Sequence, residues 1–272
     1  MEIKTGKTPG TILIDCSECG HDFEMEDFRG SDTEEIWTTA LNKCRWCPDC
    51  RERIIEEEKA ETARKMEAQR RRNFYSNLRA NLGEAGIPPG YIFDRKTQEI
   101  FVSPPVRYAA EWLWQNRERN VVLSGVTGSG KSTSACFVAL KMMEELQSKV
   151  RYYTMGEVLS LWRAARRSED NDADLRFLRT LFRDHDLVIV DEVVGKARIS
   201  ESGQELLFDL IEAVNNGNCQ SRIWLLGNFY SGSIEAIFAD PEPIRRRLQE
   251  NFSCVRLDPE LGRCVNLKVW EK

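Results

Sequence analysis

The sequence of 272 residues predicts an α/β protein in which a parallel β-sheet is flanked by helices and preceded by a small metal-binding module and a charged helix. From Tyr91 onward, strand-like runs alternate with helix-like runs, as in a parallel sheet. A glycine-rich loop joins the first of these strands to the first helix. Five of the nine cysteines fall within residues 16–50, which indicates metal ligands. We therefore expect three parts, at residues 1–50, 51–85 and 86–272.

Composition excludes several classes of protein. An apolar fraction of 41% is enough to form a core, which argues against wholesale disorder. The longest aliphatic run, residues 187–190, is far shorter than the roughly 18 apolar residues of a membrane span, and the N-terminus has no apolar signal region. The net charge of −5 excludes a uniformly basic nucleic-acid-binding surface. We expect a soluble, cytoplasmic protein that does not bind membranes.

Residues 1–50 contain few large aliphatic side chains, and a structural zinc ion would supply the stability that so short a segment lacks. Two C-x-x-C pairs favour a Cys₄ zinc site over a redox dithiol. The predicted zinc ligands are Cys16, Cys19, Cys47 and Cys50. Cys44 is an alternative ligand in the second pair, and His21 is a weaker substitute. With 5 basic and 11 acidic residues, this part suits a protein partner better than DNA.

Residues 51–85 are predicted to form a charged linker helix. They contain almost no helix breaker before a glycine- and proline-rich stretch at residues 83–90. Glu61 and Lys65 have the i,i+4 spacing of an ion pair on a helix. A solvated spacer is the favoured interpretation, and the basic and aromatic cluster at residues 70–75 leaves DNA binding as the alternative.

Residues 86–272 carry the alternating strands and helices of the predicted sheet domain. The expected strands lie at residues 120–124, 150–154, 187–190, 223–226, 253–257 and 264–270. The expected helices lie at residues 131–147, 156–167, 171–184, 202–215, 231–239 and 242–251. Strands that are separated by helices favour a parallel α/β sheet.

The loop after the first strand, GVTGSGKS at residues 125–132, matches the phosphate-binding pattern G-x-x-x-x-G-K-S/T. Its glycines let backbone N–H groups turn toward phosphate oxygens, and the following helix adds its dipole. Lys131 would contact the β- and γ-phosphates, and the Ser132 hydroxyl would bind Mg²⁺. The strand before and the helix after argue against a chance glycine-rich turn. The predicted nucleotide contacts are Gly125, Val126, Thr127, Gly128, Ser129, Gly130, Lys131, Ser132, Thr133 and Asp191.

Polar side chains follow two further strands. Asp191 and Glu192 come directly after the aliphatic strand at residues 187–190, at the edge where parallel sheets bind ligands. Asp191 would hold Mg²⁺, and Glu192 would act as the general base that activates water for hydrolysis. Asn228 follows the next strand and would either sense the γ-phosphate or cap a loop. The arginines at residues 245–247 could stabilise charge across a subunit interface or remain solvated.

These motifs resemble those of the DnaC/IstB-like branch of the AAA+ ATPases over roughly residues 86–257. The segments that carry the resemblance are GVTGSGKS at 125–132, LVIVDEV at 187–193, SGQELLFDLIEAV at 202–214, WLLGN at 224–228, PIRRRL at 243–248 and GIPP at 86–89. The resemblance implies a P-loop AAA+ sheet without a separate helical lid, since only 25 residues follow Arg247. It also implies that Asn228 is the sensor 1 residue and that Arg247 is the catalytic arginine finger. The chain departs from the family at residues 214–216, where an arginine is usual, and at Gly227, where the family usually has serine before the asparagine.

The resemblance further implies an ATP-dependent loader. Such a protein would bind a hexameric replicative helicase through its N-terminal zinc module, assemble with copies of itself through the AAA+ domain, and deliver the helicase onto single-stranded DNA. An IstB-type transposition helper that recruits a transposase is the alternative, and a non-catalytic adaptor is a third interpretation.

A DNA surface would combine aromatic and basic side chains. The expected DNA-contacting residues are Trp162, the arginines among residues 163–167, and Arg176, Phe177, Arg179 and Arg183. The family also inserts helices in this region to contact DNA. A solvated helix face with Trp162 in the core is the alternative.

Overall fold

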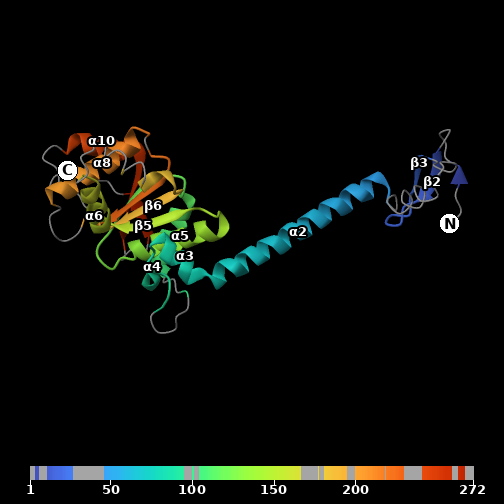
Figure 1. Cartoon of the computed structure of the whole chain (residues 1–272), viewed down its shortest axis with the longest axis horizontal. Coiled ribbons are helices and arrows are strands. Elements are labelled where there is room, and N and C mark those ends of the chain that lie inside the picture. The colour runs from blue at the N-terminus through green and yellow to red at the C-terminus, as the bar shows by residue number, and fades with distance from the viewer. Residues whose placement is uncertain are drawn as a thin grey trace. The chain divides into compact units, whose positions relative to one another are not determined.

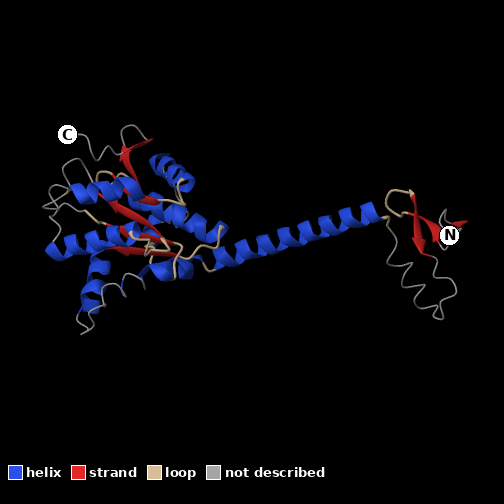
Figure 2. Ribbon diagram, turned by 90° about the horizontal axis from the view of Figure 1, so that it is seen from above, coloured by secondary structure: helices blue, strands red, loops and turns tan. Residues whose placement is uncertain are grey.

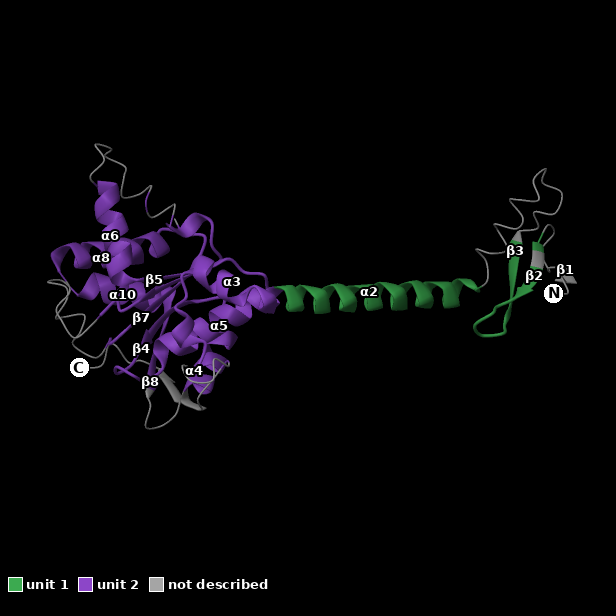
Figure 3. Ribbon diagram, turned by 60° about the horizontal axis from the view of Figure 1, so that its bottom comes forward, with its two compact units in different colours: residues 1–73 green, residues 74–272 purple. Residues whose placement is uncertain are grey.

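The computed structural model describes residues 4–5, 11–26, 46–94, 100, 104–166, 177, 181–194, 200–217, 219–229, 241–258 and 263–266. It divides the chain into two compact units, residues 1–73 and 74–272, which are coloured separately in Figure 3. The expected boundaries after residues 50 and 85 stay predictions. None of the helices in the described parts of the chain is long and apolar enough to cross a membrane.

The first unit contains a small antiparallel sheet in the order β1-β2-β3. Its strands are β1 (Lys4–Thr5), β2 (Thr11–Asp15) and β3 (Asp22–Glu26). β2 and β3 form a hairpin in which Asp15 pairs with Asp22. The turn of this hairpin therefore contains the first C-x-x-C pair. The backbone N–H of Gly20 donates to the carbonyl of Cys16 at 2.9 Å, which closes the turn.

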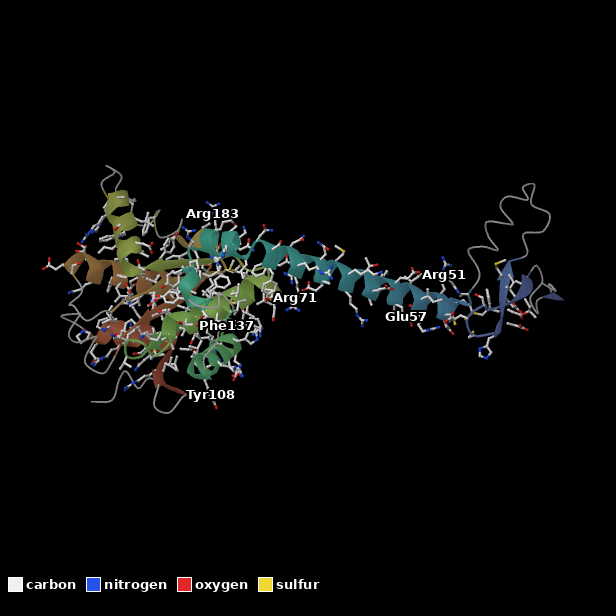
Figure 4. The ribbon with its side chains drawn as sticks, turned by 90° about the horizontal axis from the view of Figure 1, so that it is seen from below. Arg51, Glu57, Arg71, Tyr108, Phe137 and Arg183 are labelled. Carbon is white, nitrogen blue, oxygen red and sulfur yellow. The ribbon has the colours of Figure 1, made fainter. Side chains whose placement is uncertain are left out.

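The first unit also contains the long helix α2 (Pro48–Ser76), whose last residues extend past the unit boundary. It begins three residues earlier than predicted, because proline is well suited to the first position of a helix and Asp49 favourably meets the helix dipole. Its surface is charged and exposed, and the predicted pair of Lys65 and Glu61 is formed at 2.7 Å. Figure 4 shows the labelled Arg51 and Glu57 on this helix.

The prediction of one continuous helix over residues 51–85 was wrong, because the helix is interrupted at Asn77 and resumes as α3 (Leu78–Ala85). The side chains of Leu78, Leu82 and Ala85 are buried in the core of the second unit. Packing therefore assigns α3 to the sheet domain, and the helix ends at Gly86, within the stretch that the sequence marked as a stop.

The second unit is built on a six-stranded sheet in the order β5-β6-β7-β4-β8-β9. The strands are β4 (Asn120–Ser124), β5 (Val150–Thr154), β6 (Leu187–Asp191), β7 (Arg222–Gly227), β8 (Phe252–Asp258) and β9 (Arg263–Asn266). The first five strands in this order are parallel, as predicted, and β9 pairs with β8 antiparallel. The reversal follows from the short connection between β8 and β9, which is too short for a crossover helix.

The helices of the second unit cover both faces of the sheet (Figures 1 and 2). One face is covered by α3, α4 (Pro104–Gln115) and α5 (Lys131–Glu145), and the other by α6 (Met155–Arg166), α8 (Glu201–Asn215) and α10 (Glu242–Asn251). Alternate residues of each strand enter the two cores: Val121 and Leu123 face α5, whereas Val122 faces the other side. The central strands are buried on both faces and are therefore apolar along their length. Polar side chains consequently occur at the strand ends.

The helix α4 was not predicted from the sequence, although Val106, Ala109, Ala110 and Leu113 show the apolar spacing of a buried helix face. The short 3₁₀ helix η1 (Pro89–Tyr91) was not predicted either. The helix predicted at residues 231–239 lies outside the described residues, as does most of the helix predicted at 171–184.

Candidate nucleotide and zinc sites

The phosphate loop joins β4 to α5 beneath a cavity of about 620 Å³. The predicted site residues that line this cavity are Thr127, Gly128, Gly130, Lys131, Ser132, Thr133, Asp191, Glu192 and Asn228. Gly128 and Gly130 have φ of 81° and 91°, so the loop uses backbone conformations that other residues rarely adopt. Gly125 and Val126 line an adjoining cavity of about 450 Å³, which Asn228 also borders. Ser129 is buried within the loop and does not line either cavity.

Lys131 is the first residue of α5, and its ammonium group lies over the loop. Nζ donates to the carbonyl oxygens of Gly125 at 2.7 Å and Val126 at 2.9 Å, and it is 3.4 Å from Oδ1 of Asn228. Burial lowers the pKa of Lys131, and the negative charge of Asp191 opposes this shift. The lysine therefore links the loop to the polar end of β7.

Asp191 ends β6 and is 3% exposed. Its Oδ2 accepts a hydrogen bond from the Tyr152 hydroxyl at 2.6 Å, and its Oδ1 accepts one from the backbone N–H of Glu192 at 2.7 Å. Burial, together with the hydrogen bond to Asp191, raises the pKa of Tyr152. No motif in the sequence marks Tyr152. Its contact with Asp191 depends on the register of β5 with β6, which places Thr154 opposite Asp191 and Tyr152 two residues earlier.

Glu192 lies at a backbone kink directly after β6. Its φ is 58°, an uncommon value for a residue with a side chain, and the side chain is exposed at the cavity. Pairing with the next strand resumes beyond the kink, where Val193 N–H donates to the carbonyl of Leu226 and Asn228 N–H donates to that of Val194, both at 3.0 Å. The kink turns the side chain of Glu192 out of the sheet, while Val193 and Val194 remain hydrogen-bonded to the segment at the end of β7.

Gly227 explains the departure from the family pattern before Asn228. A Cβ atom on this residue would lie 2.9 Å from the backbone nitrogen of Val194 and 3.1 Å from the ring of Phe229. A serine here would therefore force the segment after Glu192 to shift, whereas glycine fits without strain. Asn228 nevertheless borders the cavity, where its side chain faces Lys131.

Arg247 does not line the nucleotide cavity of its own chain. Its Nε forms an ion pair with Glu212 on α8, and its guanidinium lies 5.4 Å from the ring centroid of Phe208. The neighbouring Arg245 pairs with Glu242 at 2.7 Å. Arg246 is the most exposed of the three, at 73% of its side chain.

The first unit brings together the four predicted zinc ligands. The Sγ atoms of Cys16, Cys19, Cys47 and Cys50 all lie within 4.8 Å of one another. Those of Cys19 and Cys47 are 3.8 Å apart, close to the separation of about 3.8 Å that tetrahedral zinc with bonds of about 2.3 Å imposes. The cluster therefore fits zinc. Cys44 lies outside the described residues, so its role as a substitute remains untested.

Two different elements hold the cysteine cluster. The hairpin turn between β2 and β3 carries the first pair, and the start of α2 carries the second. The backbone N–H of Cys47 donates to Sγ of Cys16 at 3.2 Å, which ties the two elements together. Arg53 donates to Glu18 at 3.0 Å and extends this connection one turn along α2. Backbone donors to sulfur stabilise thiolate ligands.

Only some of the residues expected to contact DNA are exposed. Trp162 is 1% exposed and belongs to the core, so its expected stacking on bases was wrong. Phe177 is half-buried against the same core. Arg163 and Arg183 are exposed, whereas Arg166 lies over the Trp162 ring at 4.1 Å and pairs with Glu205 at 2.9 Å. Arg167, Arg176 and Arg179 lie outside the described residues.

The aromatic residues at the end of α2 also serve packing. Phe74 packs against the core of the second unit. The Tyr75 hydroxyl donates to the buried carboxylate of Glu144 on α5 at 2.7 Å. These contacts favour a structural role for Phe74 and Tyr75, in place of the DNA-binding alternative.

The parallel sheet, the phosphate loop and the acidic residues after β6 define a P-loop nucleotide-binding protein. A family model of IstB-like ATP binding proteins matches residues 49–241, and the chain belongs to that family. A comparison with curated proteins finds no match.

Several solved structures are similar to parts of the chain. The DnaC helicase loader is 16% identical with a TM-score of 0.42, and the match covers 55% of this chain and 86% of DnaC. Domain III of the Thermotoga maritima replication initiation protein DnaA is 19% identical with a TM-score of 0.43, covering 63% of this chain and 68% of that one. A putative primosome component from Streptococcus pyogenes serotype M3 is 13% identical with a TM-score of 0.37, covering 55% and 76%.

Proposed function

We propose that the protein is an ATPase that loads a replicative DNA helicase onto single-stranded DNA. The observation that carries the catalytic part is the arrangement of Lys131, Asp191 and Glu192 around one cavity beside the phosphate loop. A site for nucleotide storage needs the loop and the lysine. An exposed carboxylate on a kinked backbone at the same cavity supports hydrolysis as well.

The residues of this site have separate roles in the proposed reaction. The loop N–H groups and Lys131 would bind and orient the phosphates, and Asn228 would contact the γ-phosphate region that Lys131 also reaches. Ser132 and Asp191 would hold Mg²⁺, which neutralises charge on the β- and γ-phosphates when bound. Glu192 would accept a proton from the attacking water and return it to solvent after the γ-phosphate has left.

Arg247 is proposed to act across a subunit interface in a homo-oligomer. In its own chain it pairs with Glu212, so it would exchange this partner for the nucleotide of a neighbouring copy. A guanidinium at this position would stabilise the charge that develops as the γ-phosphate is transferred. Hydrolysis would therefore depend on assembly.

The Cys₄ cluster supports the loader over the transposition helper. It stabilises a small acidic unit that precedes the ATPase unit, and we propose that this unit binds the helicase hexamer. The exposed Arg163 and Arg183 would contribute to binding single-stranded DNA by electrostatic contact with its phosphates. The transposition helper remains the second candidate, because the family match itself is to IstB-like proteins.

Hydrolysis is tested by Glu192→Gln, which keeps the size of the side chain and removes the base. Phosphate release should fall by about 10²- to 10⁴-fold, the usual contribution of a general base, while binding of a fluorescent ATP analogue is retained. Glu118→Gln, an exposed acidic residue away from the cavity, is the matched control. Unchanged phosphate release in the Glu192 variant would exclude this residue as the base.

The partner is tested by size-exclusion chromatography with light scattering. The full chain is mixed with the host replicative helicase, with and without ATP, and compared with a Cys47→Ser/Cys50→Ser variant and with Cys254→Ser as a control outside the cluster. If the protein is a loader, the wild type and the control should form a complex with the helicase, and the cluster variant should not. Absence of any complex would favour the transposition helper, and a transposase pull-down would then decide.

A further inference from the structure

The carboxylate of Asp191 is held by a side chain from a neighbouring strand. Among the described residues, two donors contact it: the Tyr152 hydroxyl reaches Oδ2 at 2.6 Å, and the N–H of Glu192 reaches Oδ1 at 2.7 Å. Each oxygen therefore has one fixed donor and keeps further lone-pair capacity. The two donors come from different parts of the chain, so together they define the plane of the carboxylate.

Tyr152 is itself firmly held. It is 4% exposed and belongs to the core beneath α3 and α5. Its backbone pairs in the parallel ladder with Ile189, two residues before Asp191. Its ring contacts that of Tyr91, with centroids 6.1 Å apart and planes inclined at 58°, and Tyr91 lines the nucleotide cavity. The hydroxyl consequently has little freedom to leave Asp191.

We propose that Tyr152 is a positioning residue for the magnesium–nucleotide complex, because its hydroxyl fixes the orientation of Asp191 toward the cavity. This inference rests on the proposed nucleotide function of the same site. One further feature supports it. A buried carboxylate that lost this donor would also lose part of its stabilisation, since burial penalises a charge with few hydrogen bonds.

The structure offers a matched pair of variants on one strand. Tyr152→Phe keeps the ring and its packing and removes only the hydroxyl. The adjacent Tyr153 faces the opposite core and stacks with Arg151 at 5.1 Å, so Tyr153→Phe removes a hydroxyl from the same strand without contacting Asp191. Both variants are made in the full chain, and melting followed by circular dichroism checks that each is folded.

The test measures binding of a fluorescent ATP analogue as Mg²⁺ is titrated, and again in EDTA. For Tyr152→Phe, the Mg²⁺ concentration that gives half-maximal enhancement should rise by about tenfold or more, the usual cost of losing a partner of a metal-holding residue, while binding in EDTA changes less than twofold. Tyr153→Phe should match the wild type in both conditions. An unchanged Mg²⁺ dependence in Tyr152→Phe would overturn the proposal.

A double-mutant cycle separates positioning from a general structural effect. If Tyr152 acts through Asp191, then Tyr152→Phe should have no further effect on Mg²⁺ dependence in an Asp191→Asn background. An equal effect in both backgrounds would contradict that role. Failure of the wild type to bind the analogue at all would instead refute the nucleotide function on which the inference rests.

Discussion

The backbone of Gly227 leaves no room for a side chain, which makes this position a sensitive point of the site. Gly227→Ala would place a Cβ atom 2.9 Å from the backbone nitrogen of Val194. We expect a loss of about 1–3 kcal/mol in the free energy of unfolding, as for overpacking in other cores, with weaker ATP binding because Asn228 follows directly. Urea denaturation and analogue binding would measure the two effects.

Gly83→Ala is the matched control for this prediction. Gly83 lies within α3, and a Cβ atom there would meet no atom within 4 Å. Alanine is preferred to glycine in a helix by about 0.8–1 kcal/mol, so this variant should be as stable as the wild type or more so. Equal stability of the two variants would show that the contact with Val194 does not constrain Gly227.

At the residue scale, the sequence predicted the side chains that belong to short, recognisable motifs. Lys131, Asp191, Glu192 and Asn228 meet at one cavity because the carboxyl ends of β4, β6 and β7 lie at the same edge of one parallel sheet. Tyr152 was not predictable in this way. Its role depends on a contact with Asp191 across 39 positions of the chain, which becomes visible only when the strand register is known.

At the scale of elements, Trp162 distinguishes packing from DNA binding on α6. It is buried at 1% exposure, whereas the adjacent Arg163 is exposed. Trp162→Ala should lower the free energy of unfolding by about 3–5 kcal/mol. Arg163→Ala should leave stability nearly unchanged and weaken binding of single-stranded DNA in a fluorescence anisotropy titration, with a reduced salt dependence. If neither variant weakens DNA binding, the DNA contact lies elsewhere on the protein.

The elements themselves were predictable to different degrees. The β4–loop–α5 unit was found because strand, glycines and helix are adjacent in sequence. The long helix was found as well, but not its break at Asn77, since neither neighbour of this residue is a strong helix breaker. Packing of α3 against the sheet decides where the linker helix ends, and such a tertiary preference overrides local propensity.

At the scale of the whole molecule, the two units should respond differently to metal removal. The first unit relies on four cysteines, whereas the second has two apolar cores, one on each face of its sheet. We expect one zinc per chain by elemental analysis. A strong chelator should then unfold the first unit and leave binding of an ATP analogue intact. Loss of analogue binding in step with loss of zinc would contradict independent units.

The same contrast explains what the sequence revealed about the molecule as a whole. Spacing predicted a four-cysteine site but left Cys44 as an alternative in the second pair, and the structure brings Cys16, Cys19, Cys47 and Cys50 together. Where one unit ends and the next begins was harder to locate, since α2 runs through the division after residue 73 without a compositional change.

The left-handed backbone at Glu192 implies a trade-off between stability and activity at this position. Such a conformation costs a residue with a Cβ atom about 1–2 kcal/mol, and glycine adopts it freely. Glycine at this position would therefore make the fold more stable and at the same time remove the proposed base. Selection of this protein for heat resistance alone would favour glycine or asparagine at position 192, and the resulting proteins would bind nucleotide without turning it over.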